Sequence, residues 1–369
     1  MNILYIVPYQ FSKPTGGGKF AIFNQIKYIS KIATITIAGV AANEATPEFD
    51  CNMMPVFSNA ASRYINLLKF FTLRNIIREN KIQLIILEHP YMAPLGILLQ
   101  KLCGVKFAIR SQNVEYLRFK DMGKWWWRIL QMFEKWAHNQ ADAVLCITED
   151  DKAFFKNQGV KSKLIDFPFG TCIASSPLDK SDCKQQILKQ HQLSSDTKII
   201  LYNGTLNYLP NVTGLDIILD HVNPYLQQHL SNYKIIICGS KLPEKYNALI
   251  AIPNIIYCGF VEDIGVYFKG ADVFINPVQG GGGIKTKLVE ALAYGTTTIS
   301  SKDGAKGLIQ STAVGKLIIT PDFDGITMAK KIIEEVLKTA NTPTPKSYYD
   351  YYYWPNIAQK VVKELEAIL

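Results

Sequence analysis

The sequence predicts an α/β protein of two doubly wound domains, each a parallel sheet covered by helices on both faces. Short apolar runs alternate with stretches of helical periodicity along most of the 369 residues, an order typical of parallel sheets with helical crossovers. The alternation fades near residue 172 into a polar stretch and restarts near residue 198. A chain of this length also exceeds the usual size of one domain. We therefore predict domains at 1–171 and 172–345 and a closing segment at 346–369.

The elements of the first domain follow from this periodicity, beginning with an apolar run directly after Met1. Buried strands are predicted at 3–7, 33–40, 84–87, 107–109, 143–147 and 164–167. Helices are predicted at 18–31, 63–80, 92–103, 123–140 and 149–158.

The second domain has the same alternation without being a close sequence repeat of the first. Strands are predicted at 198–202, 234–238, 255–258, 273–275, 297–300 and 316–319. Helices are predicted at 211–229, 243–250, 263–269, 285–294 and 322–340. A Pro-rich link at 342–345 precedes an aromatic segment at 348–355 and a last helical pattern at 356–368. Because exposed aromatic patches invite aggregation, we expect the aromatic segment to dock onto the rest of the protein.

The composition favours a cytosolic globular protein. Seven scattered cysteines form no CxxC pair, which fits a reducing compartment. No apolar stretch approaches the roughly 20 residues of a membrane-spanning helix. Residues 1–170 hold 21 Lys+Arg against 13 Asp+Glu, whereas residues 171–369 hold 19 against 18. This excess indicates either an anionic partner on the first domain or a generally basic, solvated surface.

The most distinctive stretch is a glycine loop at 280–283, which follows a predicted strand and precedes a helical pattern. Glycine lets a ligand approach the backbone closely, and the start of a helix offers free N–H groups and a positive dipole end. Lys285 and Lys287 add positive charge, with Glu290 one turn beyond. The pattern predicts a phosphate site. The alternative is a flexible loop before an ordinary helix.

Other polar loops also follow predicted strands, where doubly wound sheets bind ligands. The first strand is followed by Gly16-Gly17-Gly18, and the strand at 198–202 by Asn203-Gly204-Thr205. His89 follows the strand at 84–87 and could accept a hydrogen bond from a hydroxyl or take part in proton transfer. A purely structural histidine is the alternative. A polar cluster, 110–115, leaves the next strand.

Motifs for metals and for common hydrolases are missing from the sequence: HExxH, CxxC, GxxxxGK[ST] and GxSxG. Asp322-Phe323-Asp324 is a DxD pattern, which some transferases use to hold a metal. It precedes a helical pattern, so helix capping by aspartate explains it better. We expect neither a metal nor a cofactor.

The order of these motifs resembles the GT-B glycosyltransferases, specifically the large retaining family 4, over nearly the whole chain. The tail with Trp354 resembles the family's closing helix, which crosses back to the first domain. The resemblance implies two Rossmann-like domains facing a cleft, with a nucleotide-sugar donor held mainly by the second. It rests on Gly16-Gly17-Gly18, Asn203-Gly204-Thr205, Gly259-Phe260-Val261-Glu262-Asp263 and the glycine loop that runs on to Gly295.

The resemblance also implies roles for single residues. Glu290 matches the second glutamate of the family's E-x7-E pattern, which holds the donor ribose. Gly282 stands at the position of the first glutamate, which contacts the transferred sugar. That contact would pass to loop backbone or to Lys285. Gln112 replaces the histidine of an HNVE stretch, which leaves His89 as the catalytic candidate. The catalytic candidates are His89, Lys285 and Glu290, with Asn113 and Glu115 on the acceptor side. The donor-binding candidates are Gly17, Gly18, Asn203, Gly204, Thr205, Phe260, Val261, Gly282, Gly283, Ile284, Lys285, Thr286, Lys287 and Glu290.

The expected function is retaining, metal-independent transfer of a sugar to a hydroxyl of a glycan or lipid-linked acceptor, in polysaccharide or glycoconjugate synthesis. The basic amphipathic stretch 63–81 and Trp125-Trp126-Trp127 suit an anionic membrane surface on the cytoplasmic side, with core packing as the alternative. A nucleotide-sugar epimerase and a non-catalytic sugar-nucleotide binder are the competing functions. Nucleic acid is disfavoured as a partner because no recognised binding module accompanies the basic excess.

Overall fold

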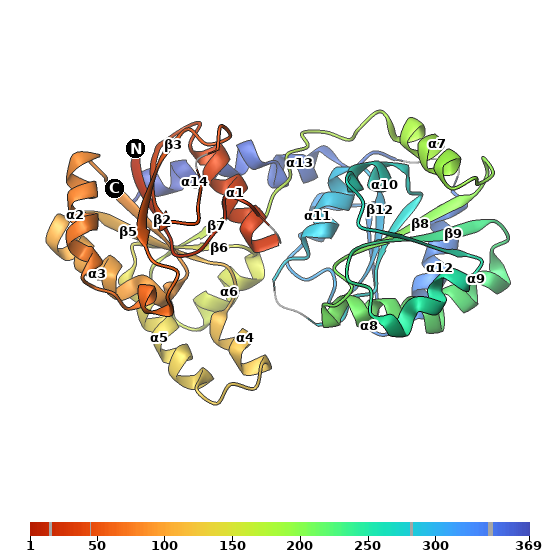
Figure 1. Cartoon of the computed structure of the whole chain (residues 1–369), viewed down its shortest axis with the longest axis horizontal. Coiled ribbons are helices and arrows are strands. Elements are labelled where there is room, and N and C mark those ends of the chain that lie inside the picture. Colours follow the sequence, from red (N-terminus) through yellow and green to blue (C-terminus); the bar gives the residue numbers. More distant parts are fainter. Residues whose placement is uncertain (15–16, 45, 281–282, 339–341) are drawn as a thin grey trace. The chain divides into compact units, whose positions relative to one another are not determined.

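Two compact units make up the chain in the computed structural model, which describes residues 1–14, 17–44, 46–280, 283–338 and 342–369 (Figure 1). The first unit comprises Met1–Gly170 and Trp354–Leu369, and the second comprises Thr171–Tyr353. Each unit holds one parallel sheet with helices on both faces (Figure 1), so the predicted fold class of two doubly wound sheets is confirmed.

The first unit has a seven-stranded sheet in the order β3-β2-β1-β4-β5-β6-β7. The order reverses between β1 and β4, so the loops after these two strands lie where doubly wound sheets bind ligands. Its strands are β1 Asn2–Val7, β2 Thr34–Val40, β3 Cys51–Phe57, β4 Leu84–Glu88, β5 Lys106–Ser111, β6 Ala143–Cys146 and β7 Lys163–Asp166. Its helices are α1 Gly17–Ile29, α2 Lys69–Glu79, α3 Ala93–Cys103, α4 Glu115–Asp121, α5 Trp127–Gln140, α6 Glu149–Asn157 and α14 Trp354–Glu366.

The second unit has a six-stranded sheet in the order β10-β9-β8-β11-β12-β13, with the reversal between β8 and β11. Its strands are β8 Lys198–Asn203, β9 Tyr233–Cys238, β10 Ile255–Gly259, β11 Val273–Asn276, β12 Thr297–Ser301 and β13 Leu317–Thr320. Its helices are α7 Lys180–Gln190, α8 Leu209–Ile217, α9 Asn223–His229, α10 Ile264–Gly270, α11 Thr286–Ala293, α12 Gly325–Val336 and α13 Lys346–Tyr352. The π-helical stretch Ile218–Val222 joins α8 to α9.

Several elements differ from the sequence prediction, among them α4 and α13, which were not predicted as helices. The edge strand β3 was not expected, because its sequence CNMMPVF contains a proline and alternates half-buried with exposed residues at its start. Helix α7 lies in the predicted polar link, since only Cys183, Ile187 and Leu188 of its residues are buried. Helix α2 begins at Lys69 rather than at residue 63, after a short 3-10 turn at Ala61–Tyr64.

The closing segment divides between the two units, whereas the prediction assigned all of 346–369 to the first. Helix α13 stays with the second unit because its tyrosines bond to α11. The Tyr348 hydroxyl donates to the Val289 carbonyl at 2.6 Å, and the Tyr349 hydroxyl donates to the Ala293 carbonyl at 2.9 Å. Helix α14 belongs to the first unit, where it packs against α1 and where Trp354 contacts Phe169.

Candidate active site

The glycine loop joins β11 to α11 at the point where the strand order of the second sheet reverses. The Gly280 N–H donates to Asp303 Oδ2 at 3.1 Å, and Gly280 and Gly283 have φ values of 68° and 69°. These are left-handed conformations that favour glycine. Gly16 and Gly282 lie outside the described residues, so their predicted roles concern positions that the structure does not describe.

Two lysines on this loop and helix occupy different surroundings. Lys285 precedes α11 and donates from Nζ to the Gly283 carbonyl at 3.2 Å. Lys287 extends to the end of β8 and the start of α8, where its Nζ donates to Asn203 O and to Asn211 Oδ1, both at 3.0 Å. Burial lowers the pKa of Lys285 to about 8 and, together with the charge of Lys285, that of Lys287 to about 7.

The loop after β8 is shaped by close contact with its neighbours. A Cβ at Gly204 would lie 2.6 Å from Asn211 Nδ2, and Asn211 Nδ2 donates to the Thr205 carbonyl at 3.0 Å. Lys287, Asn203, Gly204 and Thr205 are therefore brought together, as the sequence predicts for one binding site. Ile284 and Thr286 flank Lys285 on the same loop and first turn of α11.

Glu290 lies on α11, one turn after Lys287, and is half-buried. Within the described part of the chain, no donor or cation contacts its carboxylate. Burial raises the pKa of this carboxyl to about 7. A carboxylate held without a partner in a desolvated position is costly to a fold and is typical of a ligand-binding site.

Three further acceptor atoms at this edge of the sheet are buried and lack a hydrogen-bond donor among the described residues: Asn203 Oδ1, Asn276 Oδ1 and Gln279 Oε1. They stand at the ends of β8 and β11, next to the glycine loop. Buried acceptors without partners are rare in native proteins, so they add to the evidence for a polar ligand here. Sequence reasoning missed Asn276 and Gln279; the only signal was their position directly after a buried strand.

The other predicted donor-binding residues lie elsewhere in the fold. Phe260 and Val261 follow β10 at the sheet edge, two strands from β8, and Phe260 is exposed. Gly17 and Gly18 open α1 in the first unit. A Cβ at Gly18 would lie 3.0 Å from Gln112 Oε1, so glycine lets this turn approach the loop after β5.

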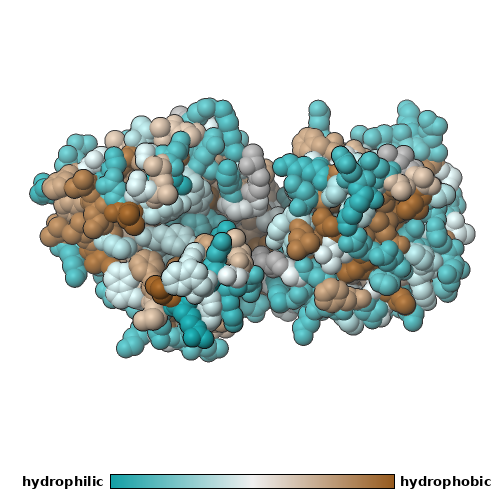
Figure 2. All heavy atoms as spheres, turned by 60° about the horizontal axis from the view of Figure 1, so that its bottom comes forward, coloured by the Kyte–Doolittle hydropathy of each residue, from teal (hydrophilic) through white to brown (hydrophobic). Residues whose placement is uncertain are grey.

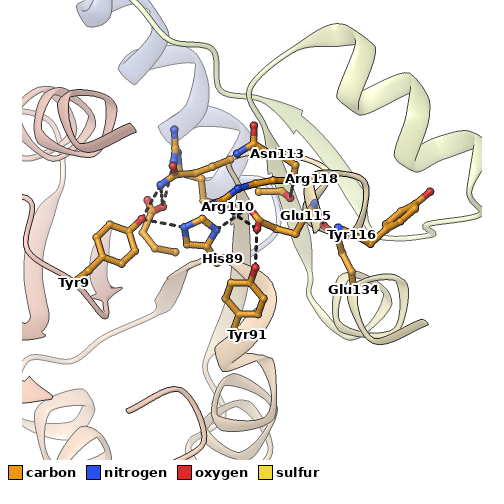
Figure 3. A network of polar contacts seen from close by, with 12 residues as sticks. Tyr9, His89, Tyr91, Arg110, Asn113, Glu115, Tyr116, Arg118 and Glu134 are labelled. Atoms are coloured by element: carbon orange, nitrogen blue, oxygen red, sulfur yellow. Dashed lines mark hydrogen bonds and ion pairs between the residues drawn. The ribbon is translucent and has the colours of Figure 1, made fainter. Parts of the chain in front are cut away.

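His89 lies at the reversal point of the first sheet, within a polar network (Figure 3). Its Nε2 lies 3.2 Å from the Tyr9 hydroxyl, and its Nδ1 lies 3.4 Å from Glu115 Oε1. Gln112 Nε2 donates to the Tyr9 oxygen at 2.7 Å, which leaves the Tyr9 proton to face His89 Nε2. The network thus favours the tautomer in which Nδ1 carries the proton and Nε2 is the acceptor.

The backbone of His89 has φ 68° and ψ 156°, a region that is almost confined to glycine. The following Pro90 holds ψ in the extended range. Keeping a side chain there costs about 1–3 kcal/mol, and such strain is concentrated at functional sites. The conformation therefore favours the functional interpretation of His89 over the structural one.

Glu115 is fully buried, so its carboxylate faces His89 and has no contact with solvent. Its Oε2 accepts from the Tyr91 hydroxyl at 2.6 Å and from Arg118 at 3.4 Å. Burial alone would raise the pKa of Glu115, but His89, Tyr91 and Arg118 together lower it. Glu134 accepts from the backbone N–H groups of Glu115 and Tyr116, and so fixes the start of α4 (Figure 3).

A second buried carboxylate, that of Glu88, supports the network around His89. Glu88 accepts from Tyr5 at 2.7 Å, Arg110 at 3.2 Å and Gln112 at 3.0 Å. Tyr9 was not predicted from the sequence, because nothing in its own neighbourhood marks it. Asn113 contributes its carbonyl, which accepts from Ser111 Oγ at 2.9 Å.

The DxD pattern serves the fold in this structure. Asp324 caps α12 by accepting from the Thr327 N–H at 2.8 Å, and Asp322 accepts from the Asp303 N–H at 2.8 Å. No cluster of three or more potential metal ligands occurs among the residues that the structure describes.

The family comparisons cover both units. A model described as "Glycosyltransferase Family 4" matches residues 40–167, and one described as "Glycosyl transferases group 1" matches residues 197–337. Over 180 residues the chain is 24% identical to a phosphatidyl-myo-inositol mannosyltransferase of Mycobacterium leprae. This stretch is 46% of the chain and 47% of the relative, so the chain spans about half the length of the curated relatives it matches.

Two solved structures are similar to the whole chain. Sucrose-phosphate synthase from Thermosynechococcus elongatus has a TM-score of 0.73 at 15% identity, with 100% of this chain and 98% of that one covered. HepE of Anabaena in complex with UDP has a TM-score of 0.73 at 15% identity, with both chains covered completely. At such identities the likeness shows the fold.

Proposed function

We propose that this chain, which belongs to the GT-B glycosyltransferases of the group 1 and family 4 type, moves a sugar from a nucleotide-sugar donor to a hydroxyl of a glycan or lipid-linked acceptor. The observation that carries the donor assignment is the Glu290 carboxylate, which is desolvated and without a partner in the described part of the chain, beside Lys285 at the reversal point of the second sheet. HepE, which has the same fold, binds UDP and UDP-glucose.

The surroundings of each group suggest its role toward the donor. Glu290 accepts hydrogen bonds from two ribose hydroxyls, which supply the donors that it lacks. Lys285 and the N–H groups at the start of α11 hold the diphosphate and stabilise the charge that develops as it leaves. Lys287 supports the site by tying the loop after β8 to α11. The buried acceptors of Asn276 and Gln279 receive hydroxyls of the sugar.

On the acceptor side, the attacking hydroxyl takes the place of the Tyr9 hydroxyl at His89 Nε2, which holds it in position, and Glu115 beside Nδ1 orients the ring. We propose transfer with retention and without a metal: as the new bond to the sugar forms, the hydroxyl proton passes from its hydrogen bond with His89 Nε2 to an oxygen of the leaving diphosphate. The anomeric configuration of the product, read by NMR from the coupling constant of the new linkage, tests this step. An inverted product would overturn retention and make His89 the general base of a direct displacement.

The experiment that tests the function is incubation with a panel of nucleotide sugars and acceptor glycans, followed by mass spectrometry. We expect one donor to yield an acceptor heavier by one sugar residue together with the free nucleoside diphosphate. Interconversion of the donor without an acceptor would identify an epimerase instead, and tight donor binding without turnover would identify a binding protein.

The proposed acceptor is lipid-linked and reached from the cytoplasmic face of a membrane. None of the helices in the described part of the chain has both the length and the apolar character of a membrane-spanning segment. The first unit exposes large apolar side chains on α2, α5 and the turns that precede them, and Figure 2 shows apolar side chains among hydrophilic ones on this unit, at the left of the view. At α2 and the turn before it the exposed side chains are Ile65, Leu68 and Phe71. We name as the apolar patch Trp125, Ile129, Met132 and Trp136, at α5 and the turn before it, whose exposed fractions run from 42% to 83%.

The patch combines apolar and basic groups in the way that anionic lipid surfaces attract. Trp125, Ile129, Met132 and Trp136 recur at the spacing of one helical stripe, and Lys124 and Arg128 lie beside them. Of the three consecutive tryptophans only Trp125 is largely exposed. Trp126 packs on Phe119 at 4.7 Å between ring centroids, and Trp127 stacks on Tyr116 at 6.2 Å.

Vesicle binding tests the apolar patch. We expect the protein to co-sediment with vesicles that contain an anionic phospholipid at low salt, and the double substitution Ile129→Ser with Met132→Ser to weaken binding at least about tenfold, because two apolar side chains leave the interface. The matched control is Leu178→Ser in the second unit, where the leucine is 100% exposed. Equal binding of all three proteins would contradict the membrane assignment.

A further inference from the structure

A cavity of about 480 Å³ lies in the second unit at the amino ends of its strands, the edge of the sheet opposite the glycine loop. It is bounded by α7, by the end of α10 and by the end of α12, together with the starts of β8 and β12. Its size is in the range of small-molecule sites. The proposed donor site makes no use of it.

The charges around the cavity are unbalanced. Five lysines line it, namely Lys180, Lys184, Lys198, Lys269 and Lys338, against the two carboxylates of Asp272 and Glu335. Lys184 pairs with Asp272 at 2.7 Å, Lys338 pairs with Glu335, and Lys269 pairs with Asp179, which stands outside the lining. Within the described part of the chain, Lys180 and Lys198 form no ion pair.

Lys180 is the most constrained of these cations. Its Nζ donates only to neutral oxygens, to the Tyr294 carbonyl at 3.3 Å and to Thr296 Oγ1 at 3.1 Å. Burial, followed by the charge of Lys316, lowers its pKa to about 8. The nearby carboxylates of Asp272 and Asp179 favour its charged form, but they pair directly with Lys184 and Lys269. A partly buried ammonium group without an ion pair of its own is unfavourable, and an anion in the cavity would reduce that cost.

We propose that this cavity binds a small phosphorylated anion through Lys180 and Lys198. A lysine is a compact point charge that suits phosphate oxygens, and two lysines without carboxylate partners match a ligand of two or more negative charges. A nucleotide or a sugar phosphate fits the volume and the charge. The existence of the site does not rest on the proposed function.

The cavity is connected to the proposed donor site by one helix. Lys180 holds the carbonyl of Tyr294 directly after α11, and the Tyr294 N–H donates to the Glu290 carbonyl at 2.9 Å. An anion that draws the Lys180 ammonium into the cavity changes the contact that ends the helix carrying Glu290. This coupling, unlike the binding itself, rests on the proposed function, and it must act equally in both directions.

Calorimetry with inorganic pyrophosphate tests the site, in a Lys285→Gln background that weakens diphosphate binding at the glycine loop. We expect Lys198→Gln and Lys180→Gln each to weaken pyrophosphate binding about tenfold, the effect of losing one charged contact. The control Lys330→Gln removes an exposed lysine of α12 outside the cavity and should leave the affinity unchanged. The Lys198 side chain forms no hydrogen bond or ion pair with a described residue, so its variant is expected to fold normally and decides the test if Lys180→Gln does not.

Proton uptake gives a second readout at pH 8. Because the pKa of Lys180 is about 8 in the empty site, part of the population is neutral, and a bound anion raises that pKa. Binding should therefore take up protons, seen as a heat that depends on the ionisation enthalpy of the buffer, and Lys180→Gln should abolish this dependence. Pyrophosphate affinity equal in wild-type, Lys180→Gln and Lys198→Gln proteins, or no binding at millimolar concentrations, would overturn the proposal without touching the proposed transferase function.

Discussion

Glu290→Ala is expected to lower kcat/KM for the nucleotide-sugar donor by about 100-fold. In the proposed donor site the substitution removes a charged acceptor of two ribose hydrogen bonds, each worth about 1.5–3 kcal/mol, and every 1.36 kcal/mol is a factor of ten, so 100-fold is the lower end of the expected loss. The carboxylate lies beside the glycine loop and has no partner among the described residues, so no internal contact is lost with it. Steady-state kinetics with the donor varied measure the effect.

The pH dependence of donor binding has a definite sign. Burial raises the pKa of Glu290 to about 7, so the accepting carboxylate form is lost as pH falls through 7. Donor KM should rise below that pH in the wild-type protein, and Glu290→Gln should flatten the profile. The control Glu334→Ala changes an exposed glutamate of α12 that pairs with Lys331 and should leave KM unchanged.

Stability separates a binding role of Glu290 from a structural one. A carboxyl whose pKa is raised on folding stabilises the protein below its unfolded pKa, and this contribution is lost as pH rises through the folded pKa. Above pH 7 the buried charge therefore opposes folding. Glu290→Gln should raise the free energy of unfolding at pH 8 by about 1 kcal/mol, with the value discounted for partial exposure. A variant that loses both stability and activity would contradict the donor assignment.

The sheets could be predicted from the sequence because parallel strands are buried on both faces. All six strands of the second unit were predicted, most of them from apolar runs such as 234–238 and 273–275. β3 was not predicted, because an edge strand does not need a continuous apolar run and because Pro55 argues against a strand. α7 escaped because three buried side chains within eleven residues give only a weak helical pattern.

The residues of the candidate site at the glycine loop could be grouped from the sequence because they are close together in the chain. Lys285, Lys287 and Glu290 share one turn and helix, so their spacing alone places them together. Contacts that depend on strand register were not visible. Lys287 reaches Asn203 across 84 positions, and Gln112 reaches Tyr9 across 103. The different environments of Lys285 and Lys287 could not be predicted, because they depend on burial in the folded protein.

The partners of His89 could not be predicted either, because Tyr9 and Glu115 lie far from it in the sequence. From the sequence, His89 was predicted as a catalytic candidate because it follows a strand, and Glu115 was predicted to lie on the acceptor side. In the fold Glu115 is fully buried and lies 3.4 Å from His89 Nδ1. The carboxylate therefore lies against the Nδ1 side of the ring, and the edge left for the proposed acceptor is formed by His89 Nε2 and the Tyr9 hydroxyl.

His89→Gly is expected to lower kcat by about 100-fold, because the attacking hydroxyl loses the group that holds it in position, while donor KM stays unchanged because the proposed donor site belongs to the second unit. Glycine is the natural choice for this test. The backbone at φ 68° and ψ 156° suits glycine better than histidine, so the variant loses the imidazole without gaining strain. Thermal unfolding should confirm a folded protein, and exogenous imidazole should restore part of the lost rate.

Glu115→Gln separates the orientation of the His89 ring from the presence of the ring itself. Glutamine still accepts from the Tyr91 hydroxyl but no longer offers a charge to His89 Nδ1. We expect kcat to fall about tenfold, less than in His89→Gly, because the ring remains but its tautomer is no longer fixed. In the double variant the two losses should not add, since Glu115 acts only through His89. Additive losses would show that Glu115 acts independently of His89, and a His89→Gly protein with unchanged kcat would show that this network holds the fold and takes no part in transfer.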